Sequence, residues 1–229
     1  MRHVFVETNW VFDFAAPEHR QAPGARALFE KARRKELTLH LPNLCLGEAR
    51  RALRNKFQAR AEPDEIRHYV RWAAGAGSLS ENDRSIVLKV VDALESKVRG
   101  DLMNLDSMFN ALRAGPGIEV FPLNDRQLAL SIEISPYVNL NPFDECVLAA
   151  VLGRADELRS VDADVELAFC ELDGHLQPWD KKRQRKDALC DLYDQRGIWV
   201  YGDFDMEEPV RPANWPSIPA KWSSTPTSE

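Results

Sequence analysis

The sequence predicts an α/β protein of three layers, with helices covering both faces of a central parallel sheet. Short apolar segments rich in β-branched and aromatic residues are typical of buried strands. Between them lie longer stretches with apolar residues at helical spacing. Strands that alternate with helices favour a parallel sheet with helices on both faces. With 229 residues, 44% of them hydrophobic, the chain is long enough for one substantial domain of this kind.

The elements can be placed in order along the chain. We expect strands at residues 2–6, 37–41, 118–121, 156–161 and 198–201. We expect helices at residues 9–14, 24–35, 44–60, 125–134, 142–153 and 189–194. Residues 62–114 are helical in pattern and predict an inserted helical hairpin, which breaks at Gly75-Ala76-Gly77-Ser78. A polar, basic loop is expected at 174–187. The domain then covers residues 1–205, followed by a Pro/Ser/Thr-rich tail at 206–229.

Composition narrows the class of protein. The net charge of −6 argues against a generally basic nucleic-acid binder, although local basic segments matter more than the total. The four cysteines are widely spaced and the five histidines scattered, which disfavours a zinc site and favours reduced thiols. No apolar run is long enough to span a bilayer, and the N-terminus reads as a strand, not as a secretory signal. We therefore expect a cytoplasmic protein.

Acidic residues stand directly beside several of the apolar segments. Glu7 follows Val4-Phe5-Val6, Glu48 follows Leu44-Cys45-Leu46-Gly47, and Asp144 precedes an apolar helical run. Asp162 and Asp164 follow the strand expected at 156–161. If these strands are parallel, Glu7 and Asp162 project from the same edge of the sheet. Desolvated carboxylates need partners, and a hard divalent cation, Mg²⁺ or Mn²⁺, suits several of them at once.

Four of these segments, taken in order, resemble the PIN-domain nucleases, which include the VapC-type toxins of toxin–antitoxin pairs. The segments are Val4-Phe5-Val6-Glu7-Thr8-Asn9, the helix that carries Glu48, the helix that begins around Asp144, and Ser160-Val161-Asp162-Ala163-Asp164. Each motif alone is weak, and their order and spacing over residues 2–201 carry the resemblance. One position departs from the family pattern, because Glu7 stands where Asp is usual.

The resemblance implies a three-layer PIN-like fold and a magnesium- or manganese-dependent endoribonuclease. It implies Glu7, Glu48, Asp144 and Asp162 as catalytic acids, with Glu7, Asp144, Asp162 and Asp164 as metal ligands. Thr8 and Ser160 would orient ligands or water, with Asn9 in a structural role. The metal would activate water and stabilise charge on an RNA phosphodiester. A toxin of this kind would have an antitoxin partner, and a homodimer is plausible by analogy.

Other interpretations of the same acids stay open. Asn141 and Pro142 would cap a helix in which Asp144 complements the helix dipole. Glu48 alone is typical of a helix surface, and Asp162-Ala163-Asp164 is typical of a turn, or of the DxD triplet of some glycosyltransferases. The longer side chain of Glu7 and the helical insertion favour a second hypothesis, a catalytically weak PIN-like module that binds RNA or a protein. A DNA-directed nuclease is a third hypothesis.

Basic and aromatic residues suggest where nucleic acid would bind. Arg51 shares a helix face with Glu48, so it would either contact phosphate or pair with that acid. Lys181, Lys182 and Arg183 begin a dense basic run that would grip a phosphate backbone, or form a solvated loop. Trp179, beside the run, would stack on a base or lie in the core. RNA and DNA are not distinguished by these motifs.

Overall fold

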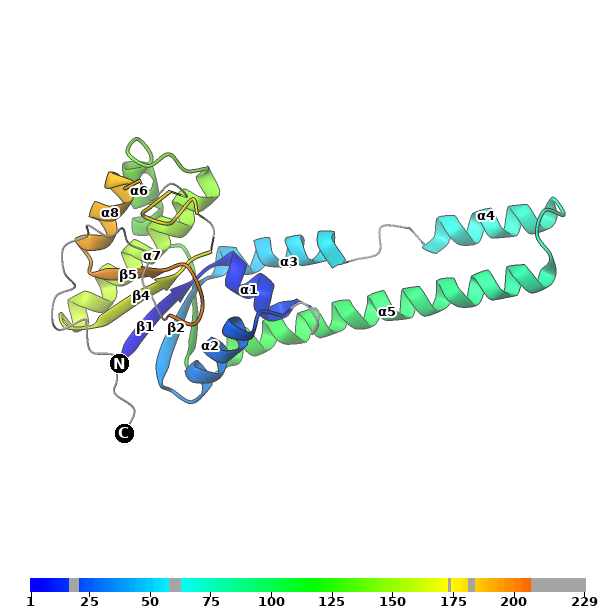
Figure 1. The fold of residues 1–229 in the computed structure, drawn as a ribbon, viewed down its shortest axis with the longest axis horizontal. Coiled ribbons are helices and arrows are strands. Elements are labelled where there is room, and N and C mark those ends of the chain that lie inside the picture. Colours follow the sequence, from blue (N-terminus) through cyan, green and yellow to red (C-terminus); the bar gives the residue numbers. More distant parts are fainter. Residues whose placement is uncertain (17–20, 58–62, 173, 181–183, 207–229) are drawn as a thin grey trace.

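The computed structural model describes residues 1–16, 21–57, 63–172, 174–180 and 184–206, and confirms the α/β class. Its centre is a five-stranded, all-parallel sheet in the order β3-β2-β1-β4-β5 (Figure 1). The strands are β1 (Arg2–Val6), β2 (Leu37–Pro42), β3 (Ile118–Phe121), β4 (Glu166–Cys170) and β5 (Ile198–Tyr201). Because every strand runs in the same direction, all five carboxyl ends lie at one edge of the sheet.

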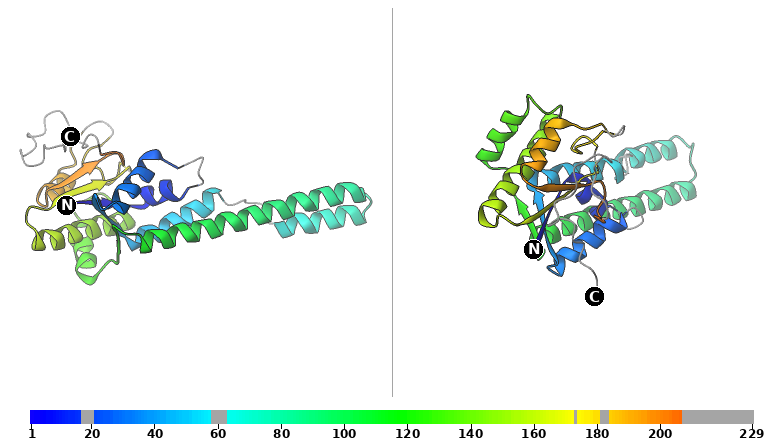
Figure 2. Two further views of the ribbon diagram at one scale, coloured as in Figure 1. Left: turned by 90° about the horizontal axis from the view of Figure 1, so that it is seen from below. Right: turned by 60° about the vertical axis from the view of Figure 1, so that its left-hand side comes forward.

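Helices cover both faces of this sheet and make the three predicted layers. One face carries α1 (Thr8–Ala15), α2 (Pro23–Arg33) and the end of the long helix α5 (Glu81–Ala114) (Figures 1 and 2). The other carries α6 (Asp125–Ile134), α7 (Pro142–Val161) and α8 (Asp187–Asp194). This split is what right-handed crossovers give when strands are added first on one side of β1 and then on the other. In the described part of the chain, no helix is both long and apolar enough to cross a membrane.

The inserted helical hairpin is present and projects far from the sheet. α3 (Asn43–Phe57) leads toward it, and α4 (Pro63–Gly75) packs antiparallel to α5 (Figure 2). The 34 residues of α5 give it a length of about 51 Å. The chain reverses at the predicted break, where Gly77 takes a positive φ of 70°. The hairpin therefore extends well beyond the domain into which it is inserted.

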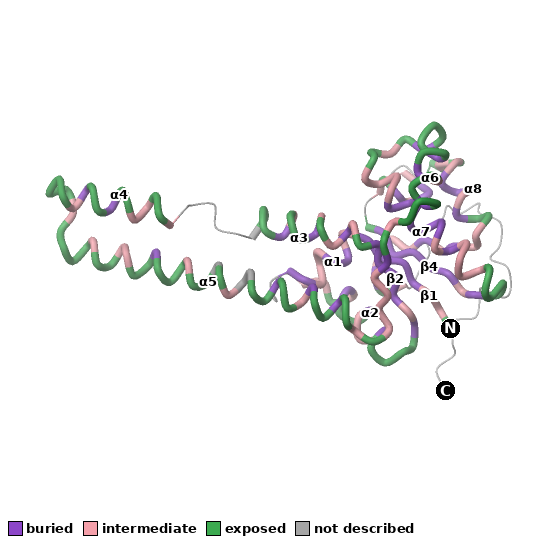
Figure 3. Tube along the Cα trace, turned by 180° about the vertical axis from the view of Figure 1, so that it is seen from behind, coloured by how far each residue is buried: buried purple, intermediate pink, exposed green. Residues whose placement is uncertain are grey.

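The core lies between the sheet and the two helical layers. Val4, Phe5 and Val6 of β1 are completely buried, because neighbouring strands flank β1 and helices cover both of its faces. In α7 the run Val147–Leu152 is buried almost completely, since this helix packs on both the sheet and α6. Figure 3 shows burial concentrated in the strands and α7, whereas the hairpin is mainly exposed.

One predicted strand is wrong. Residues 156–161 are the last turns of α7, and the fourth strand is β4, which starts at Glu166. Gly153 suggested a helix end, but it lies in mid-helix, where a Cβ would stand 2.6 Å from Gln127 Cγ of α6. This glycine serves the close approach of α6 and α7, and the helix continues past it.

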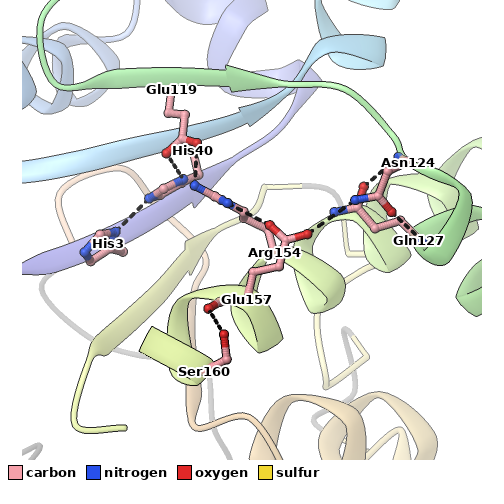
Figure 4. Close-up of polar contacts among 8 residues, drawn as sticks. All are labelled: His3, His40, Glu119, Asn124, Gln127, Arg154, Glu157 and Ser160. Carbon is pink, nitrogen blue, oxygen red and sulfur yellow. Dashed lines mark hydrogen bonds and ion pairs between the residues drawn. The ribbon is translucent and has the colours of Figure 1, made fainter. Parts of the chain in front are cut away.

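A polar network ties three strands to α7 (Figure 4). His40 of β2 is fully buried; its Nε2 lies 2.8 Å from Nδ1 of His3, and its Nδ1 lies 3.2 Å from Glu119 Oε2. Arg154 of α7 pairs with Glu119 and donates to Glu157 Oε2 at 2.7 Å. The contact with the His40 imidazole is the main reason that the pKa of Glu119 falls from its usual 4.5 to about 2, and Arg154 assists. This network therefore links α7 to the three strands.

We expect Glu119→Gln to remove a contribution to the free energy of unfolding that depends on pH in the wild type. The folded-state pKa of Glu119 is depressed, so its carboxylate stabilises the fold above pH 4.5, and this contribution is lost as the pH falls toward 2. In urea unfolding, the variant should be less stable than the wild type at pH 7, and the difference should narrow below pH 4.5. A difference that stays constant down to the lowest pH at which both proteins fold would contradict this role.

We expect Gly117→Ala to destabilise the fold by about 2 kcal/mol or more, measured by urea unfolding. Gly117 has a φ of 74°, and a Cβ there would lie 2.1 Å from the carbonyl oxygen of Ala32. Gly47 provides the matched control, because it lies in α3 with nothing within 4 Å of an added Cβ. Gly47→Ala should be neutral or stabilising by roughly 0.5–1 kcal/mol. Equal losses for the two variants would contradict this account.

Candidate functional site

A cleft opens at the carboxyl edge of the sheet, beside the point where the strand order reverses. β2 follows β1 on one side and β4 lies on the other, and ligands of open parallel sheets bind outside the strand ends at such a point. The cleft has a volume of about 460 Å³. It is lined by Glu7, Thr8, Asn9, Phe12, Glu48, Ala52, Lys56, Asn141, Phe143, Asp144, Val147 and Leu176. Three of the predicted acids thus share one cleft, contributed by three separate parts of the chain.

Glu7 is held where β1 meets α1. It is the N-cap of α1, and its Oε2 accepts a hydrogen bond of 2.8 Å from the backbone amide of Asn9. Its side chain is only 5% exposed. The partial positive charge of the helix N-terminus stabilises a carboxylate at this position. Asn9 contacts this acid through its backbone amide.

Glu48 comes from α3, which packs across α1. The hydroxyl of Thr8 donates a hydrogen bond of 2.6 Å to Glu48 Oε2, so Thr8 orients this acid as predicted. Cys45, one turn earlier in α3, is completely buried below the acids. Burial is the main cause that raises the pKa of the Cys45 thiol, and the charges of Glu7 and Glu48 raise it further. This thiol therefore stays protonated at neutral pH, and the charges of the two acids act on it from the same side of the domain core.

Asp144 stands at the third position of α7, as the helix-capping interpretation predicted. Asn141 is the N-cap, and its Oδ1 accepts from the amides of Phe143 and Asp144 at 2.9 and 3.0 Å. Its side-chain amide donates to Asp144 Oδ2 at 2.7 Å. Asp144 therefore lies in the first turn of α7 and also lines the cleft, because the N-terminus of α7 is directed at the cleft.

Lys56 was not singled out by the sequence analysis as a site residue. Glu48, Ala52 and Lys56 recur every fourth residue and line the cleft along one face of α3. That spacing was the signal available in the sequence. The Lys56 ammonium lies 4.8 Å from the centre of the Phe12 ring. Burial raises the pKa of nearby Asp13, and Lys56 partly opposes that rise. The cleft therefore contains a cation as well as acids.

The assignments of Asp162, Asp164 and Ser160 to the site are corrected by the fold. Asp162 is the C-cap of α7, and its Oδ1 accepts from the amide of Asp164 at 3.0 Å. Ser160 donates to the carbonyl of Glu157 at 2.6 Å. These residues precede β4, so they lie at the opposite edge of the sheet from Glu7. They form a turn, the alternative that the sequence had left open.

Glu171 occupies the position that Asp162 was expected to fill. β4 ends at Cys170, which pairs in register with Val6, so Glu171 follows its strand as Glu7 follows β1. Glu171 is completely buried. Its charge adds to the burial that raises the pKa of Tyr193 in α8. The signal was present in the sequence, since Leu167–Cys170 is an apolar run followed by an acid.

Two of the predicted nucleic-acid contacts are changed by the structure. Arg51 is exposed on α3 and is not among the cleft-lining residues, and Glu48 bonds with Thr8 instead of pairing with it. Trp179 is 4% exposed, so it is a core residue and does not offer a ring to a base. Lys181, Lys182 and Arg183 lie outside the described residues. Next to them, Arg185 forms ion pairs with Asp187 and Asp191.

The acids of the cleft can be compared with the needs of a divalent metal. Carboxylate oxygens are the donors that Mg²⁺ and Mn²⁺ prefer, so the chemistry of Glu7, Glu48 and Asp144 fits such an ion. Within the described ranges, no three His, Cys, Asp or Glu side chains are grouped as a metal site. Thr8 and Asn141 now bond to Glu48 and Asp144. A metal ion would have to compete with those two hydrogen bonds.

Comparison of the sequence with protein-family models finds no match, and comparison with curated proteins finds none either. Functional inference for this chain therefore depends on its fold and on its cleft.

We expect Asn141→Ala to lower the free energy of unfolding by about 1 kcal/mol, because α7 loses its N-cap. Asn141→Ser should restore most of that loss, since a serine hydroxyl also accepts from the helix amides. Urea unfolding of both variants, with the exposed Asn139→Ala as control, measures the effect. Equal losses for the Ala and Ser variants would contradict the capping role.

Proposed function

We propose that the protein is a metal-dependent endoribonuclease of the PIN type, which hydrolyses RNA phosphodiesters. One observation carries the proposal. Glu7, Glu48 and Asp144 come from the end of β1, from α3 and from the start of α7, and all three line the cleft at the carboxyl edge of the sheet. Acids are costly to gather beside a core unless they act together on a cation or a proton.

The residues of the cleft have distinct roles in this proposal. Glu7, fixed by the Asn9 amide and nearly buried, provides a carboxylate of defined position. Glu48 and Asp144 add two more carboxylates, and Thr8 orients Glu48. These acids would hold Mg²⁺ or Mn²⁺, which when bound activates water and neutralises charge on the phosphate.

The other walls of the cleft suit a nucleic-acid strand. Lys56 contributes a positive charge beside the acids, where it would contact a phosphate of the substrate. Phe12 and Phe143 provide aromatic surface, on which unpaired bases of single-stranded RNA can stack. In the proposed complex, the scissile phosphate lies over the acids and the neighbouring bases lie along these rings.

A second candidate function is a PIN-like module that binds RNA or protein but cleaves weakly. It is favoured by Glu7 in the usual place of Asp and by the acids that are not grouped as a metal site in the described residues. The two functions differ in one measurable property, which is turnover. Whether the protein is the toxin of a toxin–antitoxin pair stays a prediction, and a small gene beside its own that encodes a binding partner would support it.

We expect Asp144→Asn to reduce RNA cleavage by at least about a hundredfold, because the variant keeps the helix position but loses the charge. Purified protein is incubated with a panel of RNA and single-stranded DNA in Mg²⁺, in Mn²⁺ and in EDTA. Asp162→Asn is the matched control, since it removes a similar carboxylate at the other edge of the sheet. It should cleave like the wild type, and EDTA should stop both.

The outcomes separate the candidates. Cleavage by the wild type and Asp162→Asn, but not by Asp144→Asn, supports the nuclease and names its nucleic acid. Cleavage that survives in Asp144→Asn contradicts the site. No cleavage by folded wild type, with RNA retained in a filter-binding assay, supports the binding module instead.

A further inference from the structure

The hairpin carries large apolar side chains that the domain does not cover. On α4 these are Tyr69 and Trp72, each 62% exposed. On α5 they are Ile86, Val90 and Leu94, with exposures of 52%, 53% and 47%. Isolated apolar residues on a surface are ordinary, but a continuous group on a projecting element marks an interaction site. We name these five residues the hairpin face.

The five residues lie on the same side of the hairpin. Tyr69 and Val90 each come one position before a residue that packs against the other helix, Val70 and Val91. In two antiparallel helices, the positions that precede the inward residues point to the same side. Ile86, Val90 and Leu94 recur every fourth residue and form one stripe on α5.

Ion pairs between α4 and α5 show where the aromatic residues of α4 lie along the length of the α5 stripe. Arg67 of α4 pairs with Asp92 and Glu95 of α5. Because the helices are antiparallel, Tyr69, two residues further along α4, lies close to the level of Val90. The rings of Tyr69 and Trp72 lie 5.7 Å apart, so they form one aromatic group beside the centre of the stripe.

The hairpin by itself has little core. Over α4 and the part of α5 that packs on it, only Val70, Ala73 and Val91 are buried among the described apolar residues. A helix pair this thin gains stability when a further helical layer covers its second apolar side. The hairpin face is that second side.

We infer that the hairpin face is the interface of a homodimer, in which two copies pack antiparallel about a two-fold axis at Val90. The stripe on α5 reads Asp83, Ile86, Val90, Leu94 and Lys97, which is symmetric about Val90 in spacing and opposite in charge at its ends. In an antiparallel pair, Asp83 of each protomer lies opposite Lys97 of the other, so this contact forms twice. Ile86 of each protomer likewise lies opposite Leu94 of the other. A two-fold interface needs such self-complementarity.

The proposed dimer also has a sufficient interface area and avoids a clash between the two domains. Antiparallel hairpins place the two globular domains at opposite ends, so that the domains do not collide. Each protomer contributes two aromatic and three aliphatic side chains that are about half exposed. Their burial from both copies is on the order of 1,000 Å², the area that a specific interface needs. The candidate cleft lies in the domain, so the proposed dimer does not depend on the proposed nuclease activity.

The first test is the mass of the full chain in solution, measured by analytical ultracentrifugation over a range of concentrations. The wild type should approach twice the mass of one chain, and Val90→Glu should weaken the dimer by at least about a hundredfold because it places two like charges at the axis. Ser96→Glu, on an exposed position of α5 away from the stripe, should dimerise like the wild type. Circular dichroism checks that each variant folds, since Val90 is already half exposed.

A second test locates the axis. Val90→Cys, treated with a short bifunctional thiol reagent, should give a cross-linked dimer, because residue 90 meets its own copy. Ser96→Cys should not; both variants also carry Cys146→Ser, because Cys146 is partly exposed whereas Cys45, Cys170 and Cys190 are buried. A wild type that stays monomeric at every concentration overturns the proposal and assigns the face to a different protein. A dimer that Val90→Glu leaves intact, or that cross-links equally through residues 90 and 96, also overturns it.

Discussion

The parallel, in-register pairing of β1 with both of its neighbours is the constraint on which the rest of the structure depends. Val6 pairs with Cys170, and Phe5 pairs with His40, so β1 ends level with the strands on its two sides. The residue after each strand is therefore delivered to the same edge of the sheet. A shift of one residue would move Val4, Phe5 and Val6 onto the opposite faces of the sheet, and because helices cover both faces, the cost of repacking these buried side chains opposes it. The position of Glu7 follows from that cost.

Two groups of charges are held at the sheet by different physical means. At the carboxyl edge, helix N-termini and hydrogen bonds from Asn9, Thr8 and Asn141 hold acids that line one cleft. On the face covered by α7, the charge of Glu119 is balanced by Arg154, and its carboxylate contacts the imidazole of His40. The second group is a closed network that fixes α7 in place. The first lines a cleft at the carboxyl edge of the sheet.

The hairpin and the domain are packed in different ways. The core of the domain is closed on all sides, with a five-stranded sheet between two layers of helices. The hairpin has one inward face and one apolar face without cover from the described chain, and it packs on the domain through the C-terminal part of α5, where Leu105, Phe109 and Leu112 join the core. An element of this kind adds little to the core. Its length and its exposed rings are better explained by contact with another molecule.

Most of the fold was predictable from the sequence, because local signals decided it. Apolar runs of four to six residues marked β1, β2, β3 and β5, and helical spacing marked the hairpin, down to its break at Gly75–Ser78. The failure lies at Gly153, whose meaning is not local. It serves contact with Gln127 of α6, and treating it as a helix end moved the fourth strand to residues 156–161.

The misplaced fourth strand also led to wrong predictions of site residues. The sequence by itself determined that acids follow apolar segments, and it identified Glu7, Glu48 and Asp144, which do line one cleft. It assigned Asp162 and did not single out Glu171, because the segment before Asp162 was interpreted as the fourth strand. Only the tertiary structure decided this, since strand pairing places Glu171 at the edge with Glu7 and leaves Asp162 at the opposite edge. The structure also decided that Lys56 lines the cleft, because α3 packs on α1. The spacing of residues along the chain cannot specify such a contact.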